Sequence, residues 1–263
     1  MQTVGRTQYQ ELYYTDPTVA APGQWVFGIN AEAWGVVAPL VYPVNTAVGS
    51  QTQTTYVSGF QGGGDLYIGY DNFLLQFQGL AGQSSTTFNA GAGASAFKTT
   101  FPSEQFDVSL RYSFSGVNLA GLTPFLIVGF DYLYMPVTDT LTSPGFFWIA
   151  TGTPVRHRVY DYNTGYVGAG GLYEFNEQTG FRVDLDVGAS WGAEKITNLL
   201  PGFVGDASGT GLAALGHATV YYHFLPEWTL QFGLKAAAIS ISNGIEPAGG
   251  VGGFMSVGYL HRF

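Results

Sequence analysis

The chain has 263 residues, no cysteine, a formal net charge of −9 and only 10% charged residues, whereas soluble proteins average about 25%. Its 16% aromatic and 46% apolar content exclude a disordered chain, and the absence of cysteine excludes a disulfide framework. Nucleic acid is not an expected partner, because eighteen acidic residues outnumber nine basic ones, and the longest apolar run, Gly121–Phe130, falls well short of the about 20 residues of a membrane-spanning helix.

Residues 1–24 come first and show no strand periodicity. The segment contains Arg6, Tyr9, Tyr13 and Tyr14, and prolines follow before position 24. Two placements stay open: the segment lies outside the barrel at its periplasmic end, or it inserts into the lumen as a plug. No apolar leader follows Met1, so an exported protein is expected to be the mature chain with an added methionine.

The remainder, 25–263, is predicted to form one domain of ten strands. Four stretches alternate clearly: Phe106 to Phe114, Phe181 to Trp191, Ala218 to Phe224 and Leu230 to Leu234 place apolar residues on one face and polar residues on the other. The predicted strands are 25–36, 56–70, 73–85, 104–115, 124–136, 157–174, 180–194, 213–225, 228–241 and 249–263.

The connections alternate in length. Long segments at 37–55, 86–103, 137–156 and 195–212 alternate with short turns such as Asp71-Asn72. Long loops on one side, short turns on the other and an even strand number are typical of outer-membrane barrels. A twelve-stranded count is the alternative, because 37–55 has room for a further hairpin.

The polar faces favour a membrane barrel over a soluble sandwich. A sandwich would carry many Lys and Glu residues on its water-facing side, whereas these faces carry Gly, Ser, Gln and isolated charges. The predicted fold class is therefore all-β: a transmembrane, antiparallel, up-and-down barrel.

The residues expected to line the lumen carry both signs of charge. A barrel of about ten strands is narrow, so these side chains form either a plugged structural barrel or a narrow channel, with the acidic excess favouring cations or neutral solutes. The candidates are Glu32, Asp65, Gln76, Gln78, Asp107, Arg111, Asp131, Asp161, Arg182, Asp184, Asp186, His217, His223, Lys235 and Arg262.

A search for catalytic chemistry gives little. Gly188 to Gly192 match the letters of a Gly-x-Ser-x-Gly motif, but that motif describes a strand-to-helix turn and this match lies within a predicted strand. Ser190 faces the polar side, and the predicted pairing places His217 about opposite it, where a buried polar contact is favoured over a nucleophile and base. No catalytic residue, cofactor or metal site is predicted, since four scattered histidines without cysteine do not indicate one.

The C-terminus carries a resemblance. The chain ends Gly-Tyr-Leu-His-Arg-Phe, with Phe263 last and Tyr259, Val257 and Met255 at alternate positions before it. This resembles the assembly signal of Gram-negative outer-membrane proteins, which implies recognition by the barrel-assembly machinery. His261 departs from the pattern, where an apolar residue is more usual.

A more limited resemblance is to the channels of the meta-pathway of phenol degradation. It involves Ala21 to Trp25, Gly64 to Gly69 and Tyr259 to Phe263; that family usually has twelve strands.

The sequence thus predicts a protein of the bacterial outer membrane. The predicted function is passive diffusion of small molecules through a narrow lumen, with membrane lipid, lipopolysaccharide, the barrel-assembly machinery and small-molecule solutes as partners. A structural barrel whose extracellular loops bind a partner is the alternative, and a barrel hydrolase is a third possibility. The sequence predicts no oligomeric state.

Overall fold

The described part of the chain is a closed antiparallel barrel. A computed structural model describes residues 24–46, 49–89, 96–114, 117, 119, 121–141, 154–176, 178–198, 204–225, 227–243 and 248–262. These residues form ten strands: β1 (Trp25–Thr46), β2 (Gly49–Tyr70), β3 (Phe73–Asn89), β4 (Ala96–Ser113), β5 (Leu122–Leu141), β6 (Pro154–Glu174), β7 (Thr179–Asn198), β8 (Val204–Leu225), β9 (Trp228–Ile241) and β10 (Ala248–Arg262). The described residues contain no helix that is long and apolar enough to cross a membrane.

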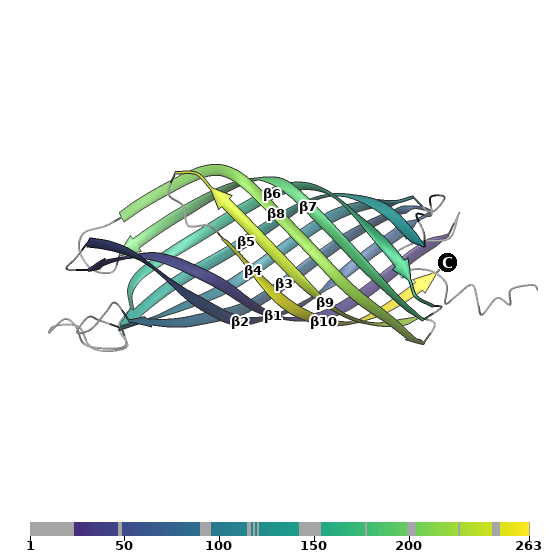
Figure 1. Ribbon diagram of the computed structural model, residues 1–263, viewed down its shortest axis with the longest axis horizontal. Helices are drawn as coiled ribbons and strands as arrows, with labels where there is room; N and C mark the ends of the chain where they lie inside the picture. The colour runs from purple at the N-terminus through teal and green to yellow at the C-terminus, as the bar shows by residue number, and fades with distance from the viewer. Residues whose placement is uncertain are drawn as a thin grey trace, which may run out of the picture.

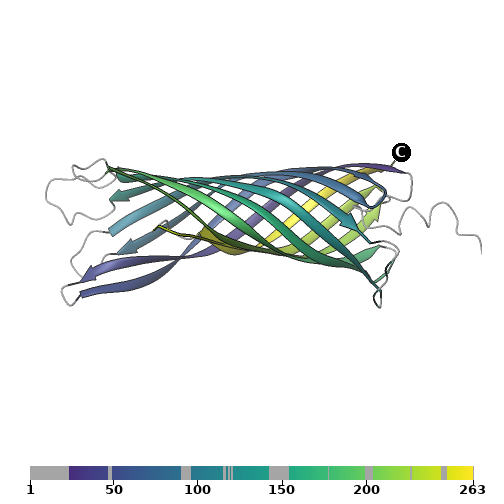
Figure 2. The same ribbon diagram turned by 90° about the horizontal axis from the view of Figure 1, so that it is seen from above.

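Each strand pairs with its neighbours in sequence, and β10 pairs back onto β1. That closing ladder runs from Val26 opposite Arg262 to Val37 opposite Val251. Figures 1 and 2 show a long barrel with strongly tilted strands and with the C-terminus at one end. We call that end, which carries connections such as Asp71-Asn72, the turn end, and the opposite end the loop end. The predicted ten-stranded barrel is confirmed.

The strands are longer toward the loop end than the sequence predicted. The expected loop 37–55 is wrong, because β1 continues to Thr46 and β2 begins at Gly49. The two strands form one ladder along this length, so the additional hairpin of the twelve-stranded alternative does not form. Alternation identifies a strand only where one face is apolar, and the Gln- and Thr-rich stretch before Tyr56 has no apolar face in its sequence.

The outer wall of the barrel is apolar. On β7, Val183, Leu185, Val187 and Trp191 are all exposed, with Leu185 at 64%. The apolar series from Phe181 to Trp191 spans about 33 Å of strand, which at the tilt of such barrels corresponds to a belt about 25 Å tall. Lys195 is the next charged outward residue on this strand. The belt height therefore matches the hydrocarbon thickness that outer-membrane barrels cover.

Aromatic rings gather on the outside at the turn end. Trp25 packs on Tyr70 with ring centroids 4.7 Å apart, and Phe73 packs on Tyr112 at 4.9 Å. Further along the rim, Trp228 contacts Tyr259 at 5.2 Å. Rings at this position form the girdle expected where a barrel wall meets a membrane–water boundary.

Candidate functional site: a lumen in stacked layers

The lumen is filled in layers, of which the first, at the turn end, is apolar. Val26, Tyr67, Leu74 and Leu260 form one buried cluster of this layer. Phe125, Leu172 and Tyr221 form a second on the other side of the barrel. These side chains narrow the lumen at its turn end.

The next layer is charged and surrounds a cavity of about 100 Å³. Its lining contains six carboxylates against three lysine or arginine side chains and His217. Twelve of the lumen candidates line it: Glu32, Asp65, Gln76, Gln78, Asp107, Arg111, Asp131, Arg182, Asp184, Asp186, His217 and Lys235. Inward-facing positions on many strands thus bring together residues that are far apart in the sequence. We call these twelve residues the charged layer.

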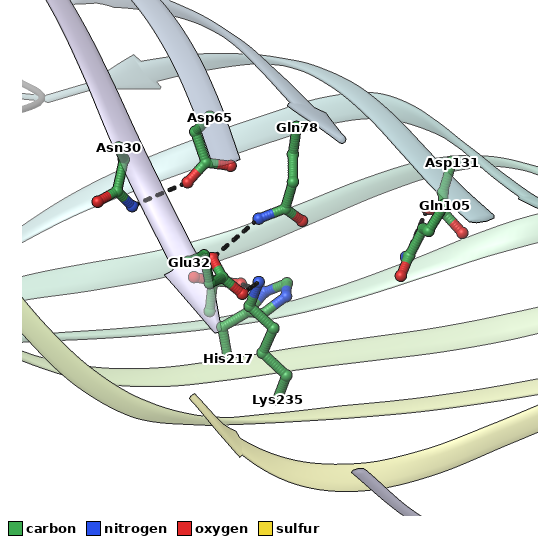
Figure 3. Close-up of polar contacts among 9 residues, drawn as sticks. Asn30, Glu32, Asp65, Gln78, Gln105, Asp131, His217 and Lys235 are labelled. Carbon is green, nitrogen blue, oxygen red and sulfur yellow. Dashed lines mark hydrogen bonds and ion pairs between the residues drawn. The ribbon is translucent and has the colours of Figure 1, made fainter. Parts of the chain in front are cut away.

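Glu32 is a centre of contacts in the charged layer (Figure 3). Lys235 on β9 reaches over β10 to form an ion pair with it, and Gln78 on β3 donates a hydrogen bond to its other oxygen at 3.1 Å. The strand between Glu32 and Gln78 is β2, where Gly63 stands opposite Glu32. Because glycine has no side chain, Glu32 and Gln78 meet directly across β2.

Tyr166 spans the opposite wall in a similar way. Its hydroxyl donates to Asp107 on β4 at 2.7 Å, although β5 lies between the two strands. The ring lies over Gly129 of β5, where an added Cβ would overlap Tyr166. Gln105 donates to Asp131 at 2.8 Å on the same side of the lumen, so hydrogen bonds hold both carboxylates of this wall.

His217 pairs with Asp184 at 2.6 Å between Nδ1 and Oδ2, directly across the β7–β8 ladder. Asp186 lies beside them, and the three side chains offer potential ligand atoms within 4.8 Å of one another. Arg182, 3.9 Å from Asp184, adds a positive charge to the same group. Since Asp184 already pairs with two cationic or potentially cationic groups, the arrangement fits an ion-pair network better than a metal centre.

The predicted proximity of Ser190 and His217 is wrong. Ser190 stands opposite Gly211 on β8, whereas His217 stands opposite Asp184, six positions earlier on β7. The Ser190 hydroxyl shares a hydrogen bond with Thr164 at 2.6 Å. Ser190 therefore makes a buried polar contact, as the sequence favoured, but its partner is Thr164.

Two further candidates lie elsewhere. His223 is buried toward the turn end and shares a hydrogen bond with Thr229 at 2.9 Å. The expectation for Asp161 is wrong: it faces outward with Asn163, while Tyr160 and Tyr162 of the same strand are buried inside. Asp161 stands opposite Ala193, which lies beyond the apolar belt, where polar side chains such as Lys195 also face outward.

Beyond the charged layer the lumen contains a mainly apolar cavity of about 150 Å³, which we call the apolar chamber. The two cavities share Gln105, Asp131 and Leu215 in their linings, so they adjoin. Sequence reasoning about polar residues missed the chamber. The alternation of inward and outward residues could have revealed it. Trp34 follows Glu32 by two positions and Leu133 follows Asp131 by two, so both share the inward faces of their strands.

A compact cluster lies between the chamber and the loop end. Tyr160 and Tyr162 stack with ring centroids 6.0 Å apart, beside buried Val137. Asp139 accepts hydrogen bonds from Thr99 at 2.7 Å and from Arg156 at 2.6 Å. This cluster narrows the lumen on the loop side of the chamber.

Several predictions fall on the ends of the chain. Residues 1–23, the Arg262 side chain and Phe263 lie outside the described residues. Of the proposed assembly signal, Met255 and Val257 are exposed on the outer wall and Tyr259 belongs to the aromatic girdle. Recognition by an assembly machinery stays a prediction.

Among solved structures, the chain is similar to the outer membrane protease OmpT from Escherichia coli, with a TM-score of 0.53, 11% identity and coverage of 92% of this chain and 97% of that chain. At this identity the likeness shows the fold alone. The translocator domain of the autotransporter NalP from Neisseria meningitidis aligns with a TM-score of 0.42, 12% identity and coverage of 91% and 89%. The P. putida toluene transporter TodX aligns with a TM-score of 0.37, 10% identity and coverage of 92% and 91%.

No protein-family model and no curated protein matches the sequence. The resemblance to the meta-pathway channels therefore stays a prediction, and the ten strands described here are fewer than the twelve usual in that family.

Proposed function

We propose that this protein is an outer-membrane barrel that passes small molecules by passive diffusion through its narrow lumen. The main observation in support is the pair of adjoining cavities, of about 100 Å³ and about 150 Å³, inside a closed barrel. The apolar belt and the turn-end aromatic girdle support a membrane location. Lipid and lipopolysaccharide would contact the outer wall, and the barrel-assembly machinery would insert it.

Acidic residues dominate the polar part of the proposed path. Six carboxylates and three lysine or arginine side chains line the charged layer. A narrow, partly dehydrated passage with this balance attracts cations and repels anions. The proposed pore therefore prefers cations and neutral solutes.

One observation favours a non-channel role as the second candidate. The contacts of Glu32 with Lys235 and of Asp107 with Tyr166 cross the lumen wall between strands that are not neighbours. Such contacts brace a barrel from within, as a purely structural or partner-binding barrel would require. In that case the charged layer stabilises the wall and passes nothing.

Current recording in a planar lipid bilayer distinguishes the channel from the structural or partner-binding barrel. The full chain should give discrete conductance steps, and under a KCl gradient its reversal potential should indicate cation preference. Asp107→Asn removes one lumen charge, which at an interaction energy of about 0.5–1 kcal/mol should lower the cation-to-anion permeability ratio by a factor of about 2–5. Glu104→Gln is the matched control, because Glu104 is an exposed carboxylate on the same strand.

Absence of conductance steps from well-folded protein would overturn passage of ions through the lumen and favour the structural barrel. Equal shifts from Asp107→Asn and Glu104→Gln would place the selectivity outside the charged layer.

A further inference from the structure

Two carboxylates of the charged layer face each other across one ladder. Asp107 on β4 stands directly opposite Asp131 on β5, and both line the cavity of about 100 Å³. We call these two residues the carboxylate pair. Like charges directly opposite each other on an antiparallel pair of strands are destabilising, so a cation that lies between the two side chains would relieve an existing repulsion.

The hydrogen bonds of the carboxylate pair come from neutral groups. Asp107 accepts from the Tyr166 hydroxyl at 2.7 Å, and Asp131 accepts from the Gln105 amide at 2.8 Å. No Lys, Arg or His of the described residues forms an ion pair with either carboxylate. The pair therefore differs from the other contacts of the charged layer, in which Lys235 and His217 each pair with a carboxylate.

Oxygen atoms of this wall stay available to a ligand. The Asp131 side chain is 3% exposed, and only its Oδ1 accepts a hydrogen bond from a described residue, while its Oδ2 is not sealed off from the lumen. Asp107 uses Oδ2 and keeps Oδ1, and Gln105, beside Asp131 in Figure 3, uses its amide nitrogen and keeps its oxygen. Directly opposite Cβ atoms lie about 5 Å apart, so one group with three N–H donors, such as a primary ammonium, can contact all three side chains.

The apolar chamber begins next to the carboxylate pair. Asp131 and Gln105 line both cavities. Leu133, the next inward residue of β5, lies about 7 Å along the strand from Asp131 and lines the chamber together with Met135. A cavity of about 150 Å³ with an apolar lining accommodates a single benzene ring. Space for one ring and a set of acceptors for an ammonium group therefore lie within the length of one small molecule.

We propose that the two cavities together bind organic cations in which a primary ammonium group is attached to a single apolar ring by a short linker. The ammonium group donates to the carboxylate pair and to Gln105, and the ring occupies the apolar chamber. The proposal rests on the proposed function and names its substrate class. Anions are repelled by the pair, and an ammonium group that leaves water requires acceptors for its N–H groups, which this wall supplies.

Binding is measured by calorimetric titration into the full chain in nanodiscs of neutral lipid at neutral pH, with empty nanodiscs subtracted. The probes are benzylamine, which is cationic at this pH, benzyl alcohol, which keeps the ring without the charge, and methylammonium, which keeps the charge without the ring. Benzylamine should bind at least tenfold more tightly than either of the others. Equal affinity for benzyl alcohol or for methylammonium, or no binding of benzylamine, overturns the proposal.

The carboxylate pair is tested by removing one charge at a time. Asp131→Asn should weaken benzylamine binding about tenfold, because it replaces a charge-assisted contact with a neutral one, and should leave benzyl alcohol binding unchanged. Asp107→Asn is the second variant and should act in the same direction, which protects the test against misfolding of the first. Glu104→Gln is the matched control, because Glu104 is an exposed carboxylate on the same strand as Asp107. Equal benzylamine affinity in all three variants overturns the proposed site.

The position of the ring is tested in the chamber. Ala237→Phe fills the chamber, because Ala237 lines it, and should weaken benzylamine binding at least tenfold while leaving methylammonium binding unchanged. Ala238→Phe is the matched control, because the next residue on the strand is exposed on the outer wall. Equal benzylamine affinity in these two variants contradicts the placement of the ring.

Conductance measurements separate a failure of this inference from a failure of the proposed function. The full chain is recorded in a planar bilayer, first in KCl and then in benzylammonium chloride. Current steps in KCl without benzylamine binding in the titration overturn the binding site and leave the proposed passage intact. Benzylamine binding without current steps in either salt contradicts the proposed passage and leaves the binding site intact.

Discussion

Lys235 on β9 reaches over β10 to form an ion pair with Glu32 on β1, a residue 203 positions earlier in the chain. The ammonium group also lies 4.9 Å from the ring centroid of Phe254 on β10. Three strands at the seam of the barrel, where the two ends of the chain meet, are thus joined through one side chain. The pair is both a brace and part of the charged layer.

Breaking this pair should destabilise the barrel. Glu32→Gln leaves the Lys235 charge in the lumen with its main partner removed, and the expected cost is about 3–5 kcal/mol of unfolding free energy. Reversible urea unfolding in lipid vesicles measures it. The double variant Glu32→Gln/Lys235→Met should recover a large part of the loss, because no unpaired charge remains.

Lys195→Met serves as the control, since Lys195 is exposed on the outer wall. The single variant Lys235→Met completes the comparison. If the double variant loses as much stability as Glu32→Gln and Lys235→Met lose in sum, the two residues are not coupled, and the proposed bracing contact is wrong.

Gly129 should tolerate no side chain. Its added Cβ would overlap the Tyr166 ring, whereas nothing lies within 4 Å of an added Cβ at Gly165 on the neighbouring strand. Gly129→Ala is expected to cost about 1–3 kcal/mol through overpacking, and Gly165→Ala to stay within about 0.5 kcal/mol of the wild type. Urea midpoints at constant slope compare the two, and equal midpoints would show that Tyr166 moves away freely.

The apolar belt predicts a strong effect of an outward charge. Leu185 is 64% exposed near the middle of the β7 series, and Leu185→Arg should cost about 2–4 kcal/mol in a bilayer. Ala193→Arg, on the same outward face but beyond Trp191, should cost about 1 kcal/mol or less because it lies near the boundary. Unfolding from liposomes of defined composition measures both, and similar small costs at the two positions would contradict a membrane-embedded belt.

The predicted N-terminal segment has a direct test. If residues 1–24 insert into the lumen, their removal should enlarge the single-channel conductance of the barrel. If they lie outside it, the steps should stay the same size. A variant in which Tyr9, Tyr13 and Tyr14 are replaced by serine keeps the length of the segment and asks whether those rings produce the difference.

The sequence by itself determined the barrel class and the outer wall. Series such as Phe181 to Trp191 alternate because one face forms the outer wall and the other faces the lumen, and this signal requires only local periodicity. The turn-end bounds of the strands follow for the same reason, since Tyr70 and Phe73 flank a two-residue turn. Toward the loop end the outer wall also carries polar side chains such as Asp161 and Lys195, so the contrast between the two faces disappears. For this reason 37–55 could not be recognised as strand.

Only the tertiary structure decided which inward residues meet and where space remains. The alternation in the sequence leaves the register between β7 and β8 open by a few positions. The observed register places His217 opposite Asp184 and away from Ser190. The contact between Lys235 and Glu32 depends on closure of the barrel, and the apolar chamber depends on the volumes of side chains from many strands. Periodicity assigns a residue to a face, but pairing and packing arise from shear, closure and side-chain volume, none of which is local in the sequence.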